Sequence, residues 1–192
     1  MTPVHALKRF VPLVGLVFAA GCGYNTIQTY DEQVTAAAAQ IKVQLQRRAD
    51  LIPNLVETVK AYAKQERTVF TEVSEARAKL AGAVQSGDLQ QMADANRQLS
   101  APLGRLLAIA ENYPQLKSNE NFRALQDQLE GTENRIAVAR QDYNEAVNRY
   151  NAYIRRFPQV LTAKVLGKGG LRPYFELETP GAAQAPKVDF SK

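Results

Sequence analysis

Cysteine and histidine, which supply thiol nucleophiles and imidazole bases, each occur once in the 192 residues, as Cys22 and His5. Cys22 directly follows an apolar run at residues 10–21, and two basic residues precede that run. A positive start, a short apolar stretch and small residues before one cysteine are typical of a bacterial lipoprotein signal. We therefore predict that residues 1–21 are a cleaved signal peptide and that Cys22 carries the lipid.

The alternative for this segment is an uncleaved membrane helix. A spanning helix requires about 20 apolar residues, whereas polar residues resume at 24–26, directly after the run. Gly23 stands where an aspartate would favour retention in an inner membrane, so an outer membrane is compatible with the signal. We predict a membrane-anchored lipoprotein of the bacterial cell envelope that faces the periplasm or the exterior.

Cleavage and acylation would leave the mature chain without imidazole and without a free thiol. This excludes Cys/His and Ser/His/Asp nucleophile systems and zinc sites built from His or Cys. The carboxylate, lysine, serine and tyrosine side chains that remain form no phosphate-binding, calcium-binding or nucleotide-binding motif. We therefore predict no catalytic residue, no metal and no cofactor.

Composition is that of one domain of ordinary size. About 170 mature residues suffice for a single core. The formal net charge is +5, and no basic run is interleaved with aromatic residues, so nucleic acid is not an expected partner.

Apolar residues recur every seven positions through most of the chain between residues 27 and 157, which predicts long helices. The clearest series is Phe122, Leu129, Ile136, Tyr143, Tyr150 and Phe157. Ser118 is the expected N-cap of that helix, and Pro158 marks its end. Similar series cover residues 27–80 and 89–112. Short connections imply antiparallel neighbours, so we predict an all-α, up-and-down bundle.

The number of helices depends on the region around Pro53. If Asp50 caps a new helix, Pro53 falls in its first turn, where its missing N–H costs nothing. The bundle then has four long helical segments. The seven-residue phase runs unbroken from 27 to 80, however, and this leaves one helix kinked at Pro53 as the alternative. Matching the length of the last helix, about 40 residues, favours four segments.

Two charged residues, Arg48 and Glu66, occupy seam positions in these apolar columns. One interpretation is that the seam splays or that the Arg48 stem reaches out to keep its charge in water. The other is a buried ion pair that fixes helix register, between Arg48 and a carboxylate of the last helix such as Glu130 or Glu133.

At this point three motifs resemble the LemA family. They are RRADLIPNLVETVKAYA at 47–63, ENYPQLKSNENF at 111–122, and ENRIAVAR at 133–140 with Tyr-Asn pairs at 143–144 and 150–151. The resemblance covers roughly residues 24–190 and implies a helical bundle at the bacterial envelope, usually tethered by an N-terminal membrane helix. This chain departs from the family in its lipoprotein-type signal and in lacking a tryptophan near Ala38.

The resemblance implies no catalytic residue. We expect the polar motif residues to fix helix register or to recognise a partner. These residues are Arg47, Arg48, Asp50, Asn54, Asn119, Asn121, Asn144 and Asn151. Asn119 and Asn121 are expected to cap or brace the turn after Pro114. Asn144 and Asn151 lie two turns apart on one helix face, where hydrogen bonds between helices and recognition of a partner are both open.

The tail, residues 167–192, changes character, because Gly, Pro and Ala punctuate it. We expect it to be extended or flexible. Its apolar clusters at 174–177 and 188–190 offer an alternative, which is docking on the bundle or on a partner's sheet edge. The predicted division is therefore a signal at 1–21, a LemA-like bundle at 22–166 and this tail.

These observations predict a scaffold or adaptor, not an enzyme, that is held at a membrane by its N-terminal anchor and has an envelope protein as its partner. The family's proposed roles in envelope scaffolding, membrane shape and assistance to other envelope proteins agree with this. One alternative is a protein that remodels lipid directly. Another is a carboxylate-based hydrolase of envelope glycans, which needs two acids about 5 to 9 Å apart.

Overall fold

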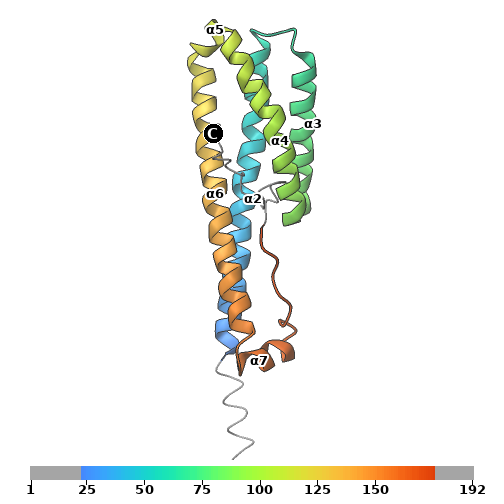
Figure 1. The fold of residues 1–192 in the computed structure, drawn as a ribbon, viewed down its shortest axis with the longest axis vertical. Coiled ribbons are helices and arrows are strands. Elements are labelled where there is room, and N and C mark those ends of the chain that lie inside the picture. The colour runs from blue at the N-terminus through green and yellow to red at the C-terminus, as the bar shows by residue number, and fades with distance from the viewer. Residues whose placement is uncertain (1–22, 176–192) are drawn as a thin grey trace, which may run out of the picture.

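A computed structural model describes residues 23–175. Its two longest helices, α2 (Tyr24–Lys60) and α6 (Glu120–Ile154), lie side by side and antiparallel (Figure 1). At 1.5 Å per residue they are about 50 to 55 Å long, and we call this pair the spine. The predicted signal, the predicted lipid site Cys22 and the tail cluster at 188–190 lie outside the described residues.

The two halves of the spine are covered differently (Figure 1). The hairpin of α3 (Arg67–Ser86) and α4 (Leu89–Ile109) packs on the half that contains the C-terminus of α2. Beyond α4, the short helices η1 (Ala110–Asn112) and α5 (Pro114–Lys117) return the chain to α6. The predicted all-α, up-and-down architecture with four long helices is confirmed.

At the opposite end of the spine, α7 (Gln159–Val165) lies beside the start of α2. From there residues 167–175, which begin in a turn at Gly167 and bend at Gly170, run back without helix or strand along the half of the spine that the hairpin leaves uncovered (Figure 1). We call this segment the strap. The apolar cluster predicted at 174–177 is described only as far as Phe175. Of the two arrangements considered for it, docking on the bundle is found for Phe175, which is buried.

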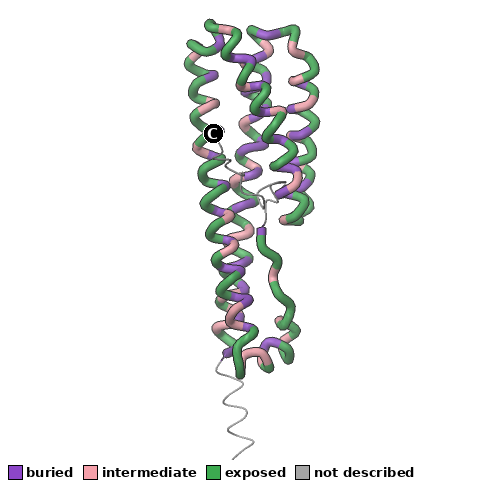
Figure 2. The backbone as a smooth tube through the Cα atoms, viewed as in Figure 1, coloured by how far each residue is buried: buried purple, intermediate pink, exposed green. Residues whose placement is uncertain are grey.

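The buried residues form one continuous stripe along the spine and into the hairpin (Figure 2). The predicted seam residues Phe122, Tyr143 and Tyr150 are almost wholly buried. Phe157, the last residue of that predicted series, is wrong as a seam residue, because α6 ends at Ile154 and Phe157 is 81% exposed. Between α3 and α4, Gly87 has φ +75°, a left-handed conformation that suits glycine. Asp88 then caps α4, because its Oδ1 accepts hydrogen bonds from the backbone N–H groups of two residues in the first turn.

The expected cap at Ser118 is wrong by one residue. Ser118 still has helical dihedral angles and is the C-cap of α5, where its hydroxyl donates to the Gln115 carbonyl. The chain becomes extended only at Asn119. Asn119 Oδ1 accepts a hydrogen bond from the Phe122 N–H at 3.0 Å, so Asn119 is the N-cap of α6.

Neither arrangement considered for Pro53 is correct, because α2 runs through it and ends later, at Lys60. Proline has no N–H for the carbonyl four residues earlier, which here belongs to Ala49. Arg77 of α3 supplies the missing donor, with its Nε at 3.1 Å from the Ala49 oxygen. The helix therefore continues because a neighbouring helix satisfies the free carbonyl.

The first reversal instead lies between Ala61 and Glu66. Turn hydrogen bonds close it, including Tyr62 N–H to Val59 O at 3.0 Å, and none of its residues has a positive φ. The buried Ala63 holds the turn against the core. Glu66 consequently precedes α3 and is not a seam residue within a continuous helix, as the seven-residue phase had suggested.

We predict that Arg77→Ala lowers the free energy of unfolding by about 1 to 3 kcal/mol, since it leaves the Ala49 carbonyl without a donor. With Pro53→Ala in the background, the N–H at position 53 can bond this carbonyl, so the same substitution should cost clearly less. Urea denaturation of the four proteins in this double-mutant cycle measures the difference. Equal costs in the two backgrounds would contradict the role assigned to Arg77.

Candidate functional site

The candidate site is the polar seam that holds the strap against the spine. Asn144 and Asn151 of α6 each pair with both polar backbone groups of one strap residue. Asn151 accepts from the Arg172 N–H at 2.8 Å and donates to the Arg172 carbonyl at 2.9 Å. Asn144 does the same with Phe175, at 2.8 and 3.2 Å. Each side-chain amide thus satisfies the backbone N–H and C=O of one strap residue, as a neighbouring strand does in a β-sheet.

Two tyrosines on the same helix add further bonds to the strap. The Tyr143 hydroxyl donates to the Pro173 carbonyl and the Tyr150 hydroxyl to the Lys168 carbonyl, both at 2.9 Å. Burial raises the pKa of both tyrosines above the usual 10.0. The hydroxyls therefore stay protonated, as donors must, throughout the neutral range.

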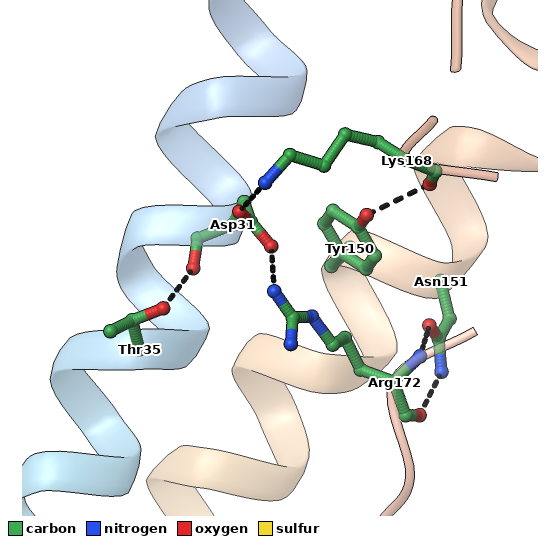
Figure 3. A network of polar contacts seen from close by, with 6 residues as sticks. All are labelled: Asp31, Thr35, Tyr150, Asn151, Lys168 and Arg172. Carbon is green, nitrogen blue, oxygen red and sulfur yellow. Dashed lines mark hydrogen bonds and ion pairs between the residues drawn. The ribbon is translucent and has the colours of Figure 1, made fainter. Parts of the chain in front are cut away.

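Asp31 joins the strap to the other helix of the spine (Figure 3). Its carboxylate accepts from Lys168 Nζ at 2.5 Å and from an Arg172 guanidinium nitrogen at 2.6 Å. Burial opposes ionisation of Asp31, but the two cations outweigh it and lower its pKa below the usual 3.8. The hydrogen bond with Asp31 in turn raises the pKa of Arg172. One buried carboxylate thus pairs with two strap cations, and the cluster keeps a net positive charge.

This cluster predicts a loss of stability in acid. A carboxylate whose pKa is lowered by folding stabilises the folded state above its unfolded pKa, and that contribution disappears as pH falls through the folded value. Asp31→Asn should lower the free energy of unfolding by about 1 to 3 kcal/mol at pH 7. The difference from the unsubstituted protein should shrink progressively below roughly pH 4, as both forms of residue 31 become neutral.

Denaturation in urea at several pH values measures this difference. Glu32→Gln is the matched control, because Glu32 is the next residue of α2 and is exposed. The control should change stability by less than about 0.5 kcal/mol at pH 7. A pH-independent effect of Asp31→Asn would contradict the ion pairs.

A second polar cluster joins three helices. Arg48 of α2 is buried, and its Nη1 donates to Asn96 Oδ1 of α4 at 2.7 Å and to Glu133 Oε2 of α6. Burial lowers the pKa of Arg48, and the charge of Glu133 opposes this effect. Of the two arrangements considered for Arg48, the contact with Glu133 is the one found. That it fixes register remains a prediction.

The other polar residues of the first motif lie on the surface. Arg47, Asp50 and Asn54 are exposed, and at spacings of three and four residues they share one face of α2. Val43 extends this face by one turn with an exposed apolar side chain. We call these four residues the α2 face. Asp50 accepts a hydrogen bond from Gln46 of its own helix at 2.8 Å.

The asparagines of the later motifs divide between the two ends of α6. Asn119 caps the helix, as expected, and its Nδ2 also donates to the Tyr62 hydroxyl at 3.1 Å. Asn121 is exposed in the first turn. The prediction that Asn144 and Asn151 form hydrogen bonds between helices is wrong, because their partners are backbone groups of the strap. Recognition of a partner by these two residues stays untested.

Four functional residues were missed, namely Asp31, Asn96, Lys168 and Arg172. A signal for two of them exists. Asp31 stands one heptad before Ala38 in an apolar column, and Asn96 stands one heptad before Leu103. A polar residue in such a column needs a polar partner when it is buried. The sequence contains no comparable signal for Lys168 and Arg172. The strap has no hydrophobic repeat from which its position on the bundle could be predicted.

The described residues offer little that would form a metal site or a deep binding pocket. Within residues 23–175 no group of three or more His, Cys, Asp or Glu side chains is placed to hold a metal ion. Surface hollows on this part of the chain include one between the α3–α4 turn and the strap, lined by Asp88, Tyr143 and Phe175. Over the same residues, no helix combines the length and the apolar character that crossing a bilayer requires.

Comparison with known proteins gives the family. The model of the LemA family matches residues 37–190. Magnetosome proteins MamQ 1 and MamQ 2 of Paramagnetospirillum magneticum are each 30% identical, over 86% of this chain and 70% of theirs. Magnetosome protein MamQ of Magnetospirillum gryphiswaldense is 26% identical, over 81% of this chain and 65% of its own. The matched region runs from the first third of α2 through the strap, and the chain belongs to the LemA family.

Proposed function

We propose that this protein is a membrane-anchored helical scaffold whose α2 face binds another protein of the bacterial cell envelope. The observation that carries the proposal is where the ends of α2 lie. The helix begins at Tyr24 at one end of the spine, while Asp50 directly follows Ala49, whose carbonyl is bonded to Arg77 of the hairpin. At 1.5 Å per residue, Asp50 is roughly 40 Å along the spine from the side on which an N-terminal anchor would attach.

The composition of the α2 face supports a binding role. It combines an apolar side chain, Val43, with a cation, an anion and an amide, and all four side chains are exposed. Such a mixed surface is compatible with an interface that forms and separates, because these interfaces are about as apolar as the rest of a protein surface. The relatives agree with a scaffold, because their names assign them to an assembly, the magnetosome, and not to a reaction.

The two alternatives have less support. A carboxylate-based glycan hydrolase needs two acids facing one cleft. Five hollows on the described surface are each lined by at most one carboxylate, such as Asp142, Asp88 or Glu32. Direct remodelling of lipid requires a surface that meets the bilayer. A bilayer contact without remodelling is equally compatible with a scaffold, so such a contact does not separate the two functions.

Photocrosslinking in native membranes tests the scaffold. A photoreactive amino acid at position 47 of the full-length chain, followed by mass spectrometry, should capture the same protein partner reproducibly. The matched control carries the photoreactive group at Ala101, which is exposed on α4. Asp50→Ala with Asn54→Ala should weaken the adduct formed from position 47 and shift the free energy of unfolding by no more than about 0.5 kcal/mol each, because both residues are exposed.

Two results would overturn the proposal. The first is a set of adducts from position 47 that does not differ from the set obtained at position 101. The second is a hydrolase activity in the purified protein that persists without any partner and disappears when Asp142 or Glu32 is replaced.

A further inference from the structure

The short helix α7 carries an apolar surface on its outer side. Leu161 and Val165 are 56% and 87% exposed. They are four residues apart, so they share one face of the helix. Ala163, on the opposite side, is fully buried against the bundle. Surface helices of globular proteins normally turn their apolar face inward, so α7 presents apolar side chains on the wrong side for a helix surrounded by water.

The segments on either side of α7 also expose apolar side chains. Phe157, directly before α7, and Leu171, in the strap, are also strongly exposed. We call these four residues the α7 face: Phe157, Leu161, Val165 and Leu171. Exposed apolar residues that stand singly need no explanation, but four within residues 157–171, on and next to one short helix, indicate a contact with another apolar phase.

The chain segment that carries the α7 face has charged residues of one sign. Residues 146–175 contain six Lys or Arg residues and no Asp or Glu. Lys168 and Arg172 share one carboxylate partner, Asp31, whereas Arg156 and Lys164, which flank the exposed apolar residues in sequence, are exposed. Apolar side chains mixed with cations are the composition of segments that lie in the headgroup region of anionic membranes.

The position of α7 places it where an N-terminal anchor would enter the membrane. Gly23 is buried at the start of α2, and a Cβ atom there would lie 3.2 Å from the Gln159 side chain of α7 and 3.6 Å from the Tyr153 hydroxyl. Consecutive Cα atoms are about 3.8 Å apart. Gly23, to which an N-terminal anchor would be joined, therefore lies directly beside α7.

We propose that the α7 face lies on an anionic lipid bilayer, as a second membrane contact next to the N-terminal anchor. A single acyl chain binds membranes only marginally, and a second apolar or basic contact makes the binding stable. The contact would hold the foot of the spine at the bilayer and leave the α2 face farther away. The proposal rests on the membrane attachment that the proposed function assumes, but it needs no protein partner.

The chain contains no tryptophan, so one substitution introduces a unique fluorophore. Full-length Leu161→Trp and Val165→Trp proteins are reconstituted in phosphatidylcholine vesicles with and without phosphatidylglycerol, with either ordinary or brominated acyl chains. Val138→Trp is the matched control, because Val138 is 58% exposed on α6, close to the 56% of Leu161. Purified components exclude any protein partner, so this result is independent of the crosslinking experiment.

Brominated anionic vesicles should quench most of the emission from position 161, because interfacial segments place their apolar face about 5 to 10 Å into the headgroup and acyl boundary. Position 165 should behave in the same way and serves if Leu161→Trp does not fold. Adding Lys164→Gln should weaken the contact about fivefold on anionic vesicles, the expected contribution of one cation near the surface, and leave it unchanged on neutral vesicles.

Quenching at positions 161 and 165 that does not exceed quenching at position 138 would overturn the proposal. So would a blue shift at position 161 that depends on protein concentration and not on bromine, because that result would indicate a second copy of the chain on the α7 face. In either case the crosslinking test of the scaffold would stand unaffected.

Discussion

Replacing Arg48 with alanine is expected to lower the free energy of unfolding by about 3 kcal/mol. The substitution removes two charge-assisted hydrogen bonds, opens a gap between three helices and leaves the buried amide of Asn96 without its guanidinium partner. Part of the loss is offset because the exposed Glu133 can return to water. Thermal and urea denaturation measure the change.

The adjacent residue provides the control. Arg47 has the same side chain but is exposed, so Arg47→Ala should alter the free energy of unfolding by less than about 0.5 kcal/mol. Glu133→Gln should fall between the two, because Arg48 keeps its bond to Asn96. If Arg48→Ala melts at the same temperature as Arg47→Ala, the buried cluster does not stabilise the bundle.

Replacing Asn144 and Asn151 together with alanine is expected to release the strap. Each side chain makes two hydrogen bonds to the strap backbone. At about 1 kcal/mol for each pair after competition with water, with a further cost for buried groups left unsatisfied, the double substitution should lose about 3 kcal/mol. The N–H groups of Arg172 and Phe175 should then exchange with deuterium roughly a hundredfold faster.

The same helix offers a matched control in Asn148, which lies between the two positions and is exposed. Asn148→Ala should leave exchange of the strap amides unchanged. The amides of α3 and α4 should keep their protection in every variant, because the strap does not cover that half of the spine. Unchanged exchange at Arg172 and Phe175 in the double variant would show that other contacts hold the strap.

The seven-residue pattern predicts the helical bundle correctly because burial on one stripe of each helix stabilises it. Phe122, Tyr143 and Tyr150 lie in the core as their spacing indicates, and Gly87 with Asp88 marks a reversal whose chemistry is local. These features depend on residues close to one another in sequence.

The first reversal could not be placed in the same way. Pro53 looked like a helix end because its own backbone lacks a donor, but the replacement donor comes from Arg77, 28 residues away from the carbonyl that it satisfies. Conversely, the reversal after Lys60 contains neither glycine nor proline and leaves the apolar phase intact. Tertiary contacts decided both points, against local propensity.

The candidate site was predicted only in part for a related reason. Arg48 was singled out because it interrupts an apolar column, and Glu133 was one of the partners considered. Asp31 interrupts a column in the same manner but at the helix start, where the pattern had scarcely begun. Its partners lie 137 and 141 residues away in a segment without periodicity, and no spacing rule links an aspartate to such a segment.

The bonds between α6 and the strap also require that the spacing of the two asparagines along the helix equals the spacing of their two partners along the strap. From Asn151 to Asn144 the helix advances seven residues, about 10.5 Å at 1.5 Å per residue. Their partners, Arg172 and Phe175, are three residues apart, about 10 Å in an extended chain. One heptad of helix therefore matches three residues of strap. A single residue inserted between 172 and 175 would shift the strap by about 3.3 Å and break the match, whereas three inserted residues, together with a heptad, would restore it.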